Sequence, residues 1–97
     1  MADAELRKRW MVSRTLLERA RRALPVSAKQ KYVPQLARYR EFLQHNEFEL
    51  ALDALEEIGN IVACRGGFWR DLERVAENMG LVNRFPVLRK NCLDVLE

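Results

Sequence analysis

The sequence predicts an all-α protein: one small domain, residues 1–97, of four to five helices built around a tight helical hairpin at His45-Asn46. Helix-forming Ala, Leu, Glu and Arg are plentiful, whereas alternating runs of β-branched residues are absent. Apolar residues also recur at steps of three and four, the spacing of one helix face. With 97 residues, 48% of them apolar, the chain can bury one core but not two.

The first helix is expected to end at Pro25, because proline cannot continue a helix from its interior. Its apolar stripe consists of Leu6, Trp10, Ser13, Leu17, Ala20 and Leu24. Residues 26–33 are expected to form a connection or a short helical turn opened by Ser27. Pro34 suits the first turn of a second helix, where its missing N–H has no intrahelical partner. That helix is expected to continue to Gln44.

The next turn is expected to place Asn46 at the N-cap of a third helix. Asn is a preferred capping residue, and Glu49, three positions later, can reach back to the cap's own N–H as in a capping box. Since the second helix ends so close before it, the two helices should form a tight hairpin. His45 is expected to be structural, at the negative end of the second helix's dipole. Loss of the Asn46 cap should cost about 1 kcal/mol.

The third helix is expected over residues 47–63, with a core stripe and an acidic face. At 100° per residue, the core stripe consists of Phe48, Ala51, Leu52, Leu55, Ile58 and Val62. The opposite side carries Glu49, Asp53, Glu56 and Glu57. Gly59 is unfavourable inside a helix, which indicates either an early helix end or a close packing point.

Two further helices are expected in the last third of the chain. Arg65-Gly66-Gly67 interrupts the helical pattern, and a fourth helix follows over residues 68–79. Gly80 and Leu81 are typical of a Schellman ending, in which the glycine takes the left-handed conformation and the leucine packs back. A short last helix is expected over residues 86–96.

Charge is segregated along the chain. Residues 1–40 hold eleven Lys/Arg against three Asp/Glu, whereas residues 41–60 hold six acids and no Lys or Arg. Such a basic segment can contact nucleic-acid phosphates. The candidate contacts are Arg7, Lys8, Arg9, Arg14, Arg19, Arg21 and Arg22. The alternative is that these side chains only surround a buried apolar stripe, and that the acidic face pairs with the basic first helix.

No catalytic, metal or cofactor site is predicted, and the protein is expected not to be an enzyme. One histidine and two distant cysteines, Cys64 and Cys92, form no recognisable catalytic or zinc-binding set, and both thiols are expected to be reduced. No apolar run approaches the 18 to 20 residues that span a bilayer, so no membrane partner is expected. The N-terminus has no signal-peptide pattern, which favours a cytoplasmic protein.

From about Tyr39 to Leu81 the chain resembles the MafI-type bacterial immunity proteins. The resemblance rests on "EFLQHNEFELALDALEEIG" and on the later "FWRDLERVAENMGL". The family's motif falls on His45, Asn46, Glu47, Leu50, Ala51, Leu52 and Asp53. The resemblance implies an all-helical cytoplasmic protein without cofactor or activity of its own, which binds and neutralises a cognate toxin.

Three classes of function therefore remain open at this stage. The first is a toxin-neutralising protein whose acidic face enters the basic cleft of a nucleic-acid-cleaving toxin. Its expected contacts are Glu49, Asp53, Glu56 and Glu57, with Leu50 and Trp69 as apolar anchors if they are exposed. The second is a small nucleic-acid-binding protein, and the third is a structural or assembly protein.

Overall fold

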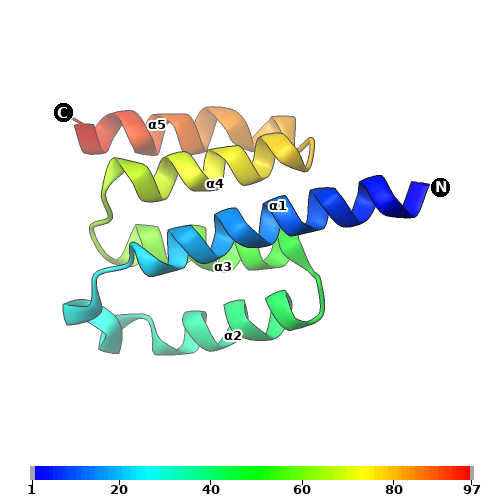
Figure 1. Ribbon diagram of the computed structural model, residues 1–97. Helices are drawn as coiled ribbons and strands as arrows, with labels where there is room; N and C mark the ends of the chain where they lie inside the picture. The colour runs from blue at the N-terminus through cyan, green and yellow to red at the C-terminus, as the bar shows by residue number, and fades with distance from the viewer. Residues whose placement is uncertain (1, 97) are drawn as a thin grey trace.

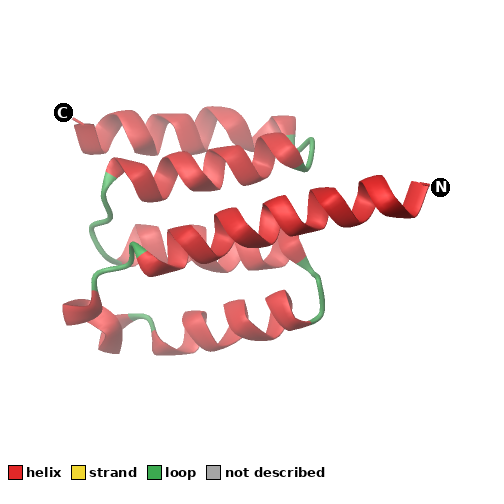
Figure 2. Cartoon of the chain, in the orientation of Figure 1, coloured by secondary structure: helices red, strands yellow, loops and turns green. Residues whose placement is uncertain are grey.

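The computed structural model describes the backbone of residues 2–96 and the side chains of residues 4–93. Within that range the chain forms five α-helices and two 3₁₀ turns, and it contains no strand (Figure 2). The elements are α1 (Ala2–Arg22), η1 (Val26–Lys31), α2 (Val33–Gln44), α3 (Phe48–Ile61), α4 (Gly66–Asn78), η2 (Val82–Arg84) and α5 (Phe85–Leu96). The predicted all-α fold is confirmed, and the helix boundaries lie within a few residues of the expected ones.

The helices run alternately in opposite directions, so that each is antiparallel to the next (Figure 1). α2 packs against α3, α4 packs against α5, and α1 lies across α3 and α4. The shortest dimension of the molecule, 18 Å, corresponds to about two layers of helices. α3 therefore occupies the middle of the bundle, with α1, α2 and α4 as neighbours.

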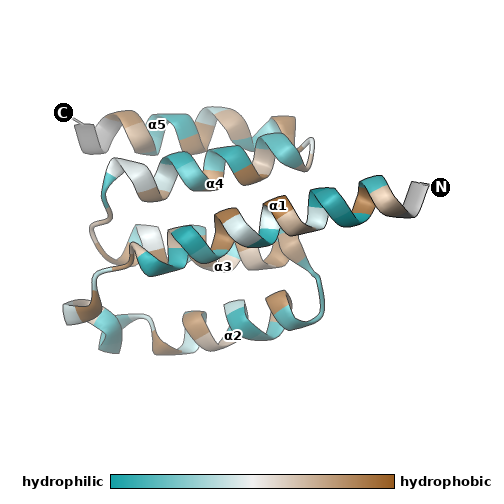
Figure 3. Ribbon diagram, in the orientation of Figure 1, coloured by the Kyte–Doolittle hydropathy of each residue, from teal (hydrophilic) through white to brown (hydrophobic). Residues whose placement is uncertain are grey.

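The core is built from one face of each helix, and Figure 3 shows the hydrophobic and hydrophilic residues alternating along the ribbons. All six residues of the core stripe expected on α3 are buried. The stripe expected on α1 is buried only from Ser13 onward. Leu6 and Trp10 are exposed, because the N-terminal part of α1 projects beyond the other helices (Figure 1).

Gly59 is a close packing point between α3 and α4. A Cβ built at this position would lie 2.5 Å from the Trp69 ring and 2.8 Å from Phe68. The two rings are themselves in edge-to-face contact, with centroids 5.2 Å apart. Only glycine leaves room for this pair, which explains its presence inside a helix despite its low propensity.

Asn46 does turn the chain between α2 and α3, but the N-cap prediction is wrong. Its φ of 59° is left-handed, and no side chain caps the start of α3. The Glu47 N–H donates to the Phe42 carbonyl and the Asn46 N–H to the Leu43 carbonyl. These two bonds are the Schellman pattern, so Asn46 ends α2 instead of beginning α3. The sequence signal is ambiguous because Asn is favoured at both kinds of position.

The end of α4 follows the same pattern and confirms the predicted Schellman ending. Gly80 has a φ of 72°, its N–H donates to the Glu77 carbonyl, and the Leu81 N–H donates to the Ala76 carbonyl. Leu81 packs against the core, as the motif requires.

Candidate partner-binding surfaces

The acidic face of α3 lies where the neighbouring helices leave this central helix uncovered. Glu49, Asp53 and Glu57 are exposed and Glu56 is partly buried. Leu50 and Ile61, on one flank of this face, are 43% and 41% exposed. We call Glu49, Leu50, Asp53, Glu57 and Ile61 the acidic ridge. The sequence predicts four of these five residues as contacts. The sequence does not predict Ile61 as a contact, although its position on the helical wheel, next to Leu50 and Glu57, is a signal that could identify it.

Two acids of this face are held by Arg84, from η2. Its guanidinium forms ion pairs with Asp53 and Glu56, the latter at 2.9 Å. Burial alone would lower the pKa of Arg84, but these two carboxylates raise it, so the guanidinium stays charged. The Asp53 side chain remains 50% exposed within this contact.

A third acid, Glu57, is contacted from α2. Arg38 donates to its carboxylate at 3.3 Å and Gln35 at 3.4 Å, and the Glu57 side chain is still 51% exposed. Among the described residues, the ion pairs of the acidic face therefore come from α2 and η2. The alternative in which this face pairs with the basic first helix is wrong.

Of the two apolar anchors considered, only Leu50 is available. Trp69 is 3% exposed, because it packs against Gly59 and Phe68 in the contact between α3 and α4. The prediction of Trp69 as an exposed anchor is therefore wrong, and Trp69 is a core residue.

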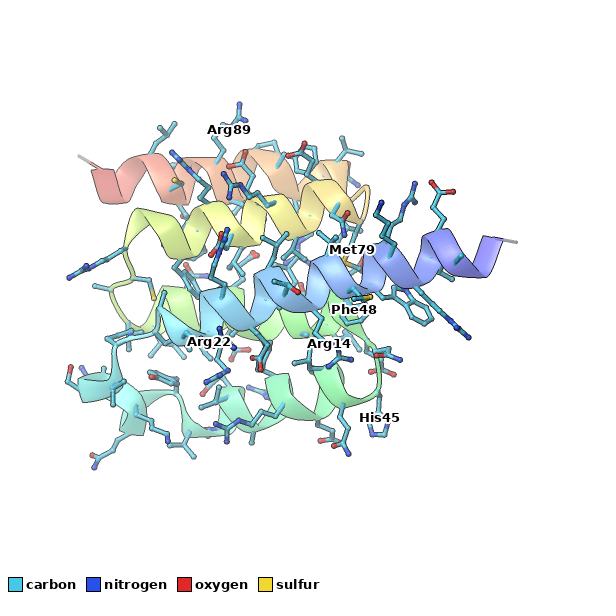
Figure 4. All side chains as sticks on the ribbon, viewed as in Figure 1. Arg14, Arg22, His45, Phe48, Met79 and Arg89 are labelled. Carbon is cyan, nitrogen blue, oxygen red and sulfur yellow. The ribbon has the colours of Figure 1, made fainter. Side chains whose placement is uncertain are left out.

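The hairpin residues are organised by α1. Arg14 donates to the Leu43 carbonyl at 3.0 Å and to the Asn46 side-chain oxygen at 2.6 Å, while its guanidinium lies 5.6 Å from the centre of the Phe48 ring (Figure 4). This cation therefore satisfies a carbonyl at the end of α2. His45 follows the last residue of α2 and is exposed at the outside of the turn (Figure 4).

The basic side chains of α1 fall into two groups. Arg19 forms a two-bond contact with Asp71 of α4, at 2.6 and 3.0 Å, and this carboxylate raises the pKa of Arg19. Arg21 donates to Glu18 at 2.7 Å. Arg14 is partly buried and bonded to neutral oxygens, and the other candidates, Arg7, Lys8, Arg9 and Arg22, are exposed and form no ion pair within the described residues.

An open groove between α1 and α2 gathers basic residues from three elements. It consists of two hollows of about 370 and 270 Å³, and both are lined by Arg21 and Arg40. The cations around it are Arg14, Arg21, Arg22, Lys29 and Arg40. We call it the α1–α2 groove. The sequence predicts phosphate contacts from its α1 residues, with Lys29 following them in the same basic segment, but it does not predict that Arg40 lies beside them. Lys29 lies in η1 and Arg40 in α2, and both line the groove because α2 folds back antiparallel to α1. The spacing of residues along the chain does not specify this arrangement.

Both cysteines are free thiols buried in the core. Burial raises the pKa of Cys64 to about 11, which keeps this thiol protonated and unreactive at neutral pH. Over residues 4–93, no three His, Cys, Asp or Glu side chains gather in a way that could hold a metal ion. Nor does any helix of the described chain have both the length and the apolar character needed to cross a membrane.

Comparison of the chain with models of protein families, with curated proteins and with solved structures found no match in any of the three.

Proposed function

We propose that this chain is a non-enzymatic protein-binding factor of the immunity type, which binds and neutralises a cognate toxin through the acidic ridge. The observation that carries the proposal is the mixed surface of α3. This helix packs against α1, α2 and α4, yet it leaves Leu50 and Ile61 exposed beside three carboxylates. Exposed apolar side chains rimmed by charge are typical of protein interfaces.

The ion pairs of the ridge support binding because they fix its carboxylates in place. Arg84 and Arg38 orient Asp53 and Glu57 while leaving each side chain about half exposed. A preoriented carboxylate loses less side-chain entropy when a cation of the partner approaches. The arrangement suits a toxin with a basic substrate cleft, which the ridge would cover while opposing its charge.

The proposal predicts a toxin gene adjacent to the gene of this protein, and it is tested with the product of that gene. The ridge variant carries Glu49→Gln, Asp53→Asn and Glu57→Gln, which remove charge without changing shape. We expect it to bind the toxin at least tenfold more weakly by calorimetry and to lose protection of cells that express the toxin. The loss should arise mainly in the association rate and should shrink as salt is added.

A matched control removes the same charge elsewhere. Glu5→Gln, Glu41→Gln and Glu77→Gln change three exposed acids outside the ridge. This control should bind within about twofold of the wild type, since distant surface charges contribute little. Wild-type affinity in the ridge variant, or an equal loss in both triple variants, would overturn the assignment of the ridge. Failure of the wild-type protein to bind or neutralise the toxin would overturn the proposed function.

A further inference from the structure

The α1–α2 groove has an excess of positive charge that no ion pair within the described residues neutralises. Five cations line it and only one described carboxylate, Glu18, accompanies them. Burial alone would raise the pKa of Glu18, but hydrogen bonds from Arg21 and Tyr39, with the charges of Arg21 and Arg22, lower it. Glu18 is therefore ionised, but it is occupied by Arg21 at 2.7 Å and Tyr39 at 2.9 Å.

The remaining cations are available to a ligand. Arg22, Lys29 and Arg40 are exposed and form no ion pair with any described residue. Arg14 is bonded only to neutral oxygens, so its charge is held in place at one end of the groove without being neutralised. In Figure 4, Arg14 and Arg22 both extend from α1 on the side of α2. Eight residues separate them along the helix, or about 12 Å.

We propose that the α1–α2 groove binds the phosphate backbone of a single-stranded nucleic acid. Four of its five cations are arginines, whose planar donors match phosphate oxygens in a two-bond geometry. The groove is open to solvent along its length, unlike the concave pockets that bury most of a small molecule. A flexible strand can bend to follow such a row of cations, whereas a duplex, with a persistence length of about 150 base pairs, cannot.

The floor of the groove argues against an acidic peptide as the ligand. Leu24, Leu36 and Leu43 are buried in the core, and of the aliphatic residues that line the groove only Val26, in η1, is exposed. The groove therefore offers one small apolar contact and not the large buried anchors that peptide recognition uses. Recognition would rest mainly on charge, which is the mode of sequence-independent binding to phosphates.

The aromatic residues of the groove indicate that bases are not recognised. Tyr32 and Tyr39 are buried, and their hydroxyls donate to the Pro25 carbonyl and to the Glu18 carboxylate. Neither ring presents a face on which a base can stack. Binding should therefore depend on salt but not on base sequence. This inference uses residues outside the acidic ridge and does not rest on the proposed function.

The experiment measures the binding of a fluorescent 20-nucleotide oligothymidine by anisotropy. About three phosphate contacts give a slope near −2 in log affinity against log salt, or a roughly 20-fold loss between 50 and 200 mM salt. The groove variant carries Arg22→Gln, Lys29→Gln and Arg40→Gln. It should bind at least tenfold more weakly at 50 mM salt and lose most of the salt slope.

A control variant with the same net charge carries Arg70→Gln, Arg74→Gln and Lys90→Gln on α4 and α5 and should bind within threefold of the wild type. Circular dichroism melting of both variants shows that each is folded. A 20-base-pair duplex and poly-glutamate should bind at least tenfold more weakly than the oligothymidine. The inference would be overturned if the two variants lost affinity equally, or if the oligothymidine did not bind at 50 mM salt. It would also be overturned if the duplex or poly-glutamate bound as tightly as the oligothymidine.

Discussion

At the scale of single residues, Asn46 contacts two helices, one through its backbone and one through its side chain, and it is not the N-cap of α3. Its backbone ends α2 in the left-handed conformation, and its side-chain oxygen accepts from Arg14 of α1. The turn is therefore tied to the first helix, 32 positions earlier in the chain. Its stability depends on backbone conformation and on this long-range hydrogen bond, not on a local cap.

Substitutions at Asn46 distinguish the two roles. Gly takes a positive φ without strain, whereas Ser does not, so Asn46→Gly should be more stable than Asn46→Ser by about 1 kcal/mol. An N-cap position would give the reverse order, because Ser caps better than Gly. Urea unfolding of the two variants measures the difference, and a more stable Asn46→Ser would contradict the structure.

At the scale of elements, the contact between α3 and α4 depends on the absence of a side chain at Gly59. Phe68 and Trp69, in the first turn of α4, occupy the space that a Cβ would need. The periodicity of α4 predicts that Phe68 faces the core. Periodicity does not predict that Trp69 is buried. Trp69 is buried because Gly59 of α3 has no side chain at the point where the Trp69 ring packs.

We expect Gly59→Ala to destabilise the protein by about 1 to 3 kcal/mol through overpacking, even though alanine is the better helix former. Gly67→Ala in α4 is the matched control, since no atom lies within 4 Å of the added Cβ. That variant should be neutral or more stable by up to about 1 kcal/mol. Thermal unfolding of both proteins measures the effects, and a stabilised Gly59→Ala would refute the close contact.

The elements also show what can be predicted from sequence and what cannot. Helix periodicity identifies the core stripe of α3 and the Gly80 ending, because both follow from local spacing and conformational preference. The ion partners of the acidic face are not predictable in this way. Arg38 and Arg84 reach it from elements before and after α3, and only the packing of the chain brings them there.

At the scale of the whole molecule, the segregation of charge along the chain persists in the folded protein. α1, η1 and α2 together form a basic groove, and α3 presents an acidic ridge. The ion pair of Arg19 with Asp71 joins α1 to α4 and uses no residue of the groove or the ridge. The ion pair of Arg84 with Asp53 leaves the Asp53 side chain 50% exposed. The fold therefore holds two surfaces of opposite charge, suited to different partners.

We propose the acidic ridge as the surface that binds a toxin. Titrating the ¹⁵N-labelled protein with an inactive form of the adjacent gene's toxin, and following the amide signals by NMR, tests it most directly. We expect small shifts in the α1–α2 groove and in α5, and the largest shifts at the ridge residues Glu49, Leu50, Asp53, Glu57 and Ile61. Shifts concentrated in the groove or along α4 and α5, with the ridge unchanged, would contradict it.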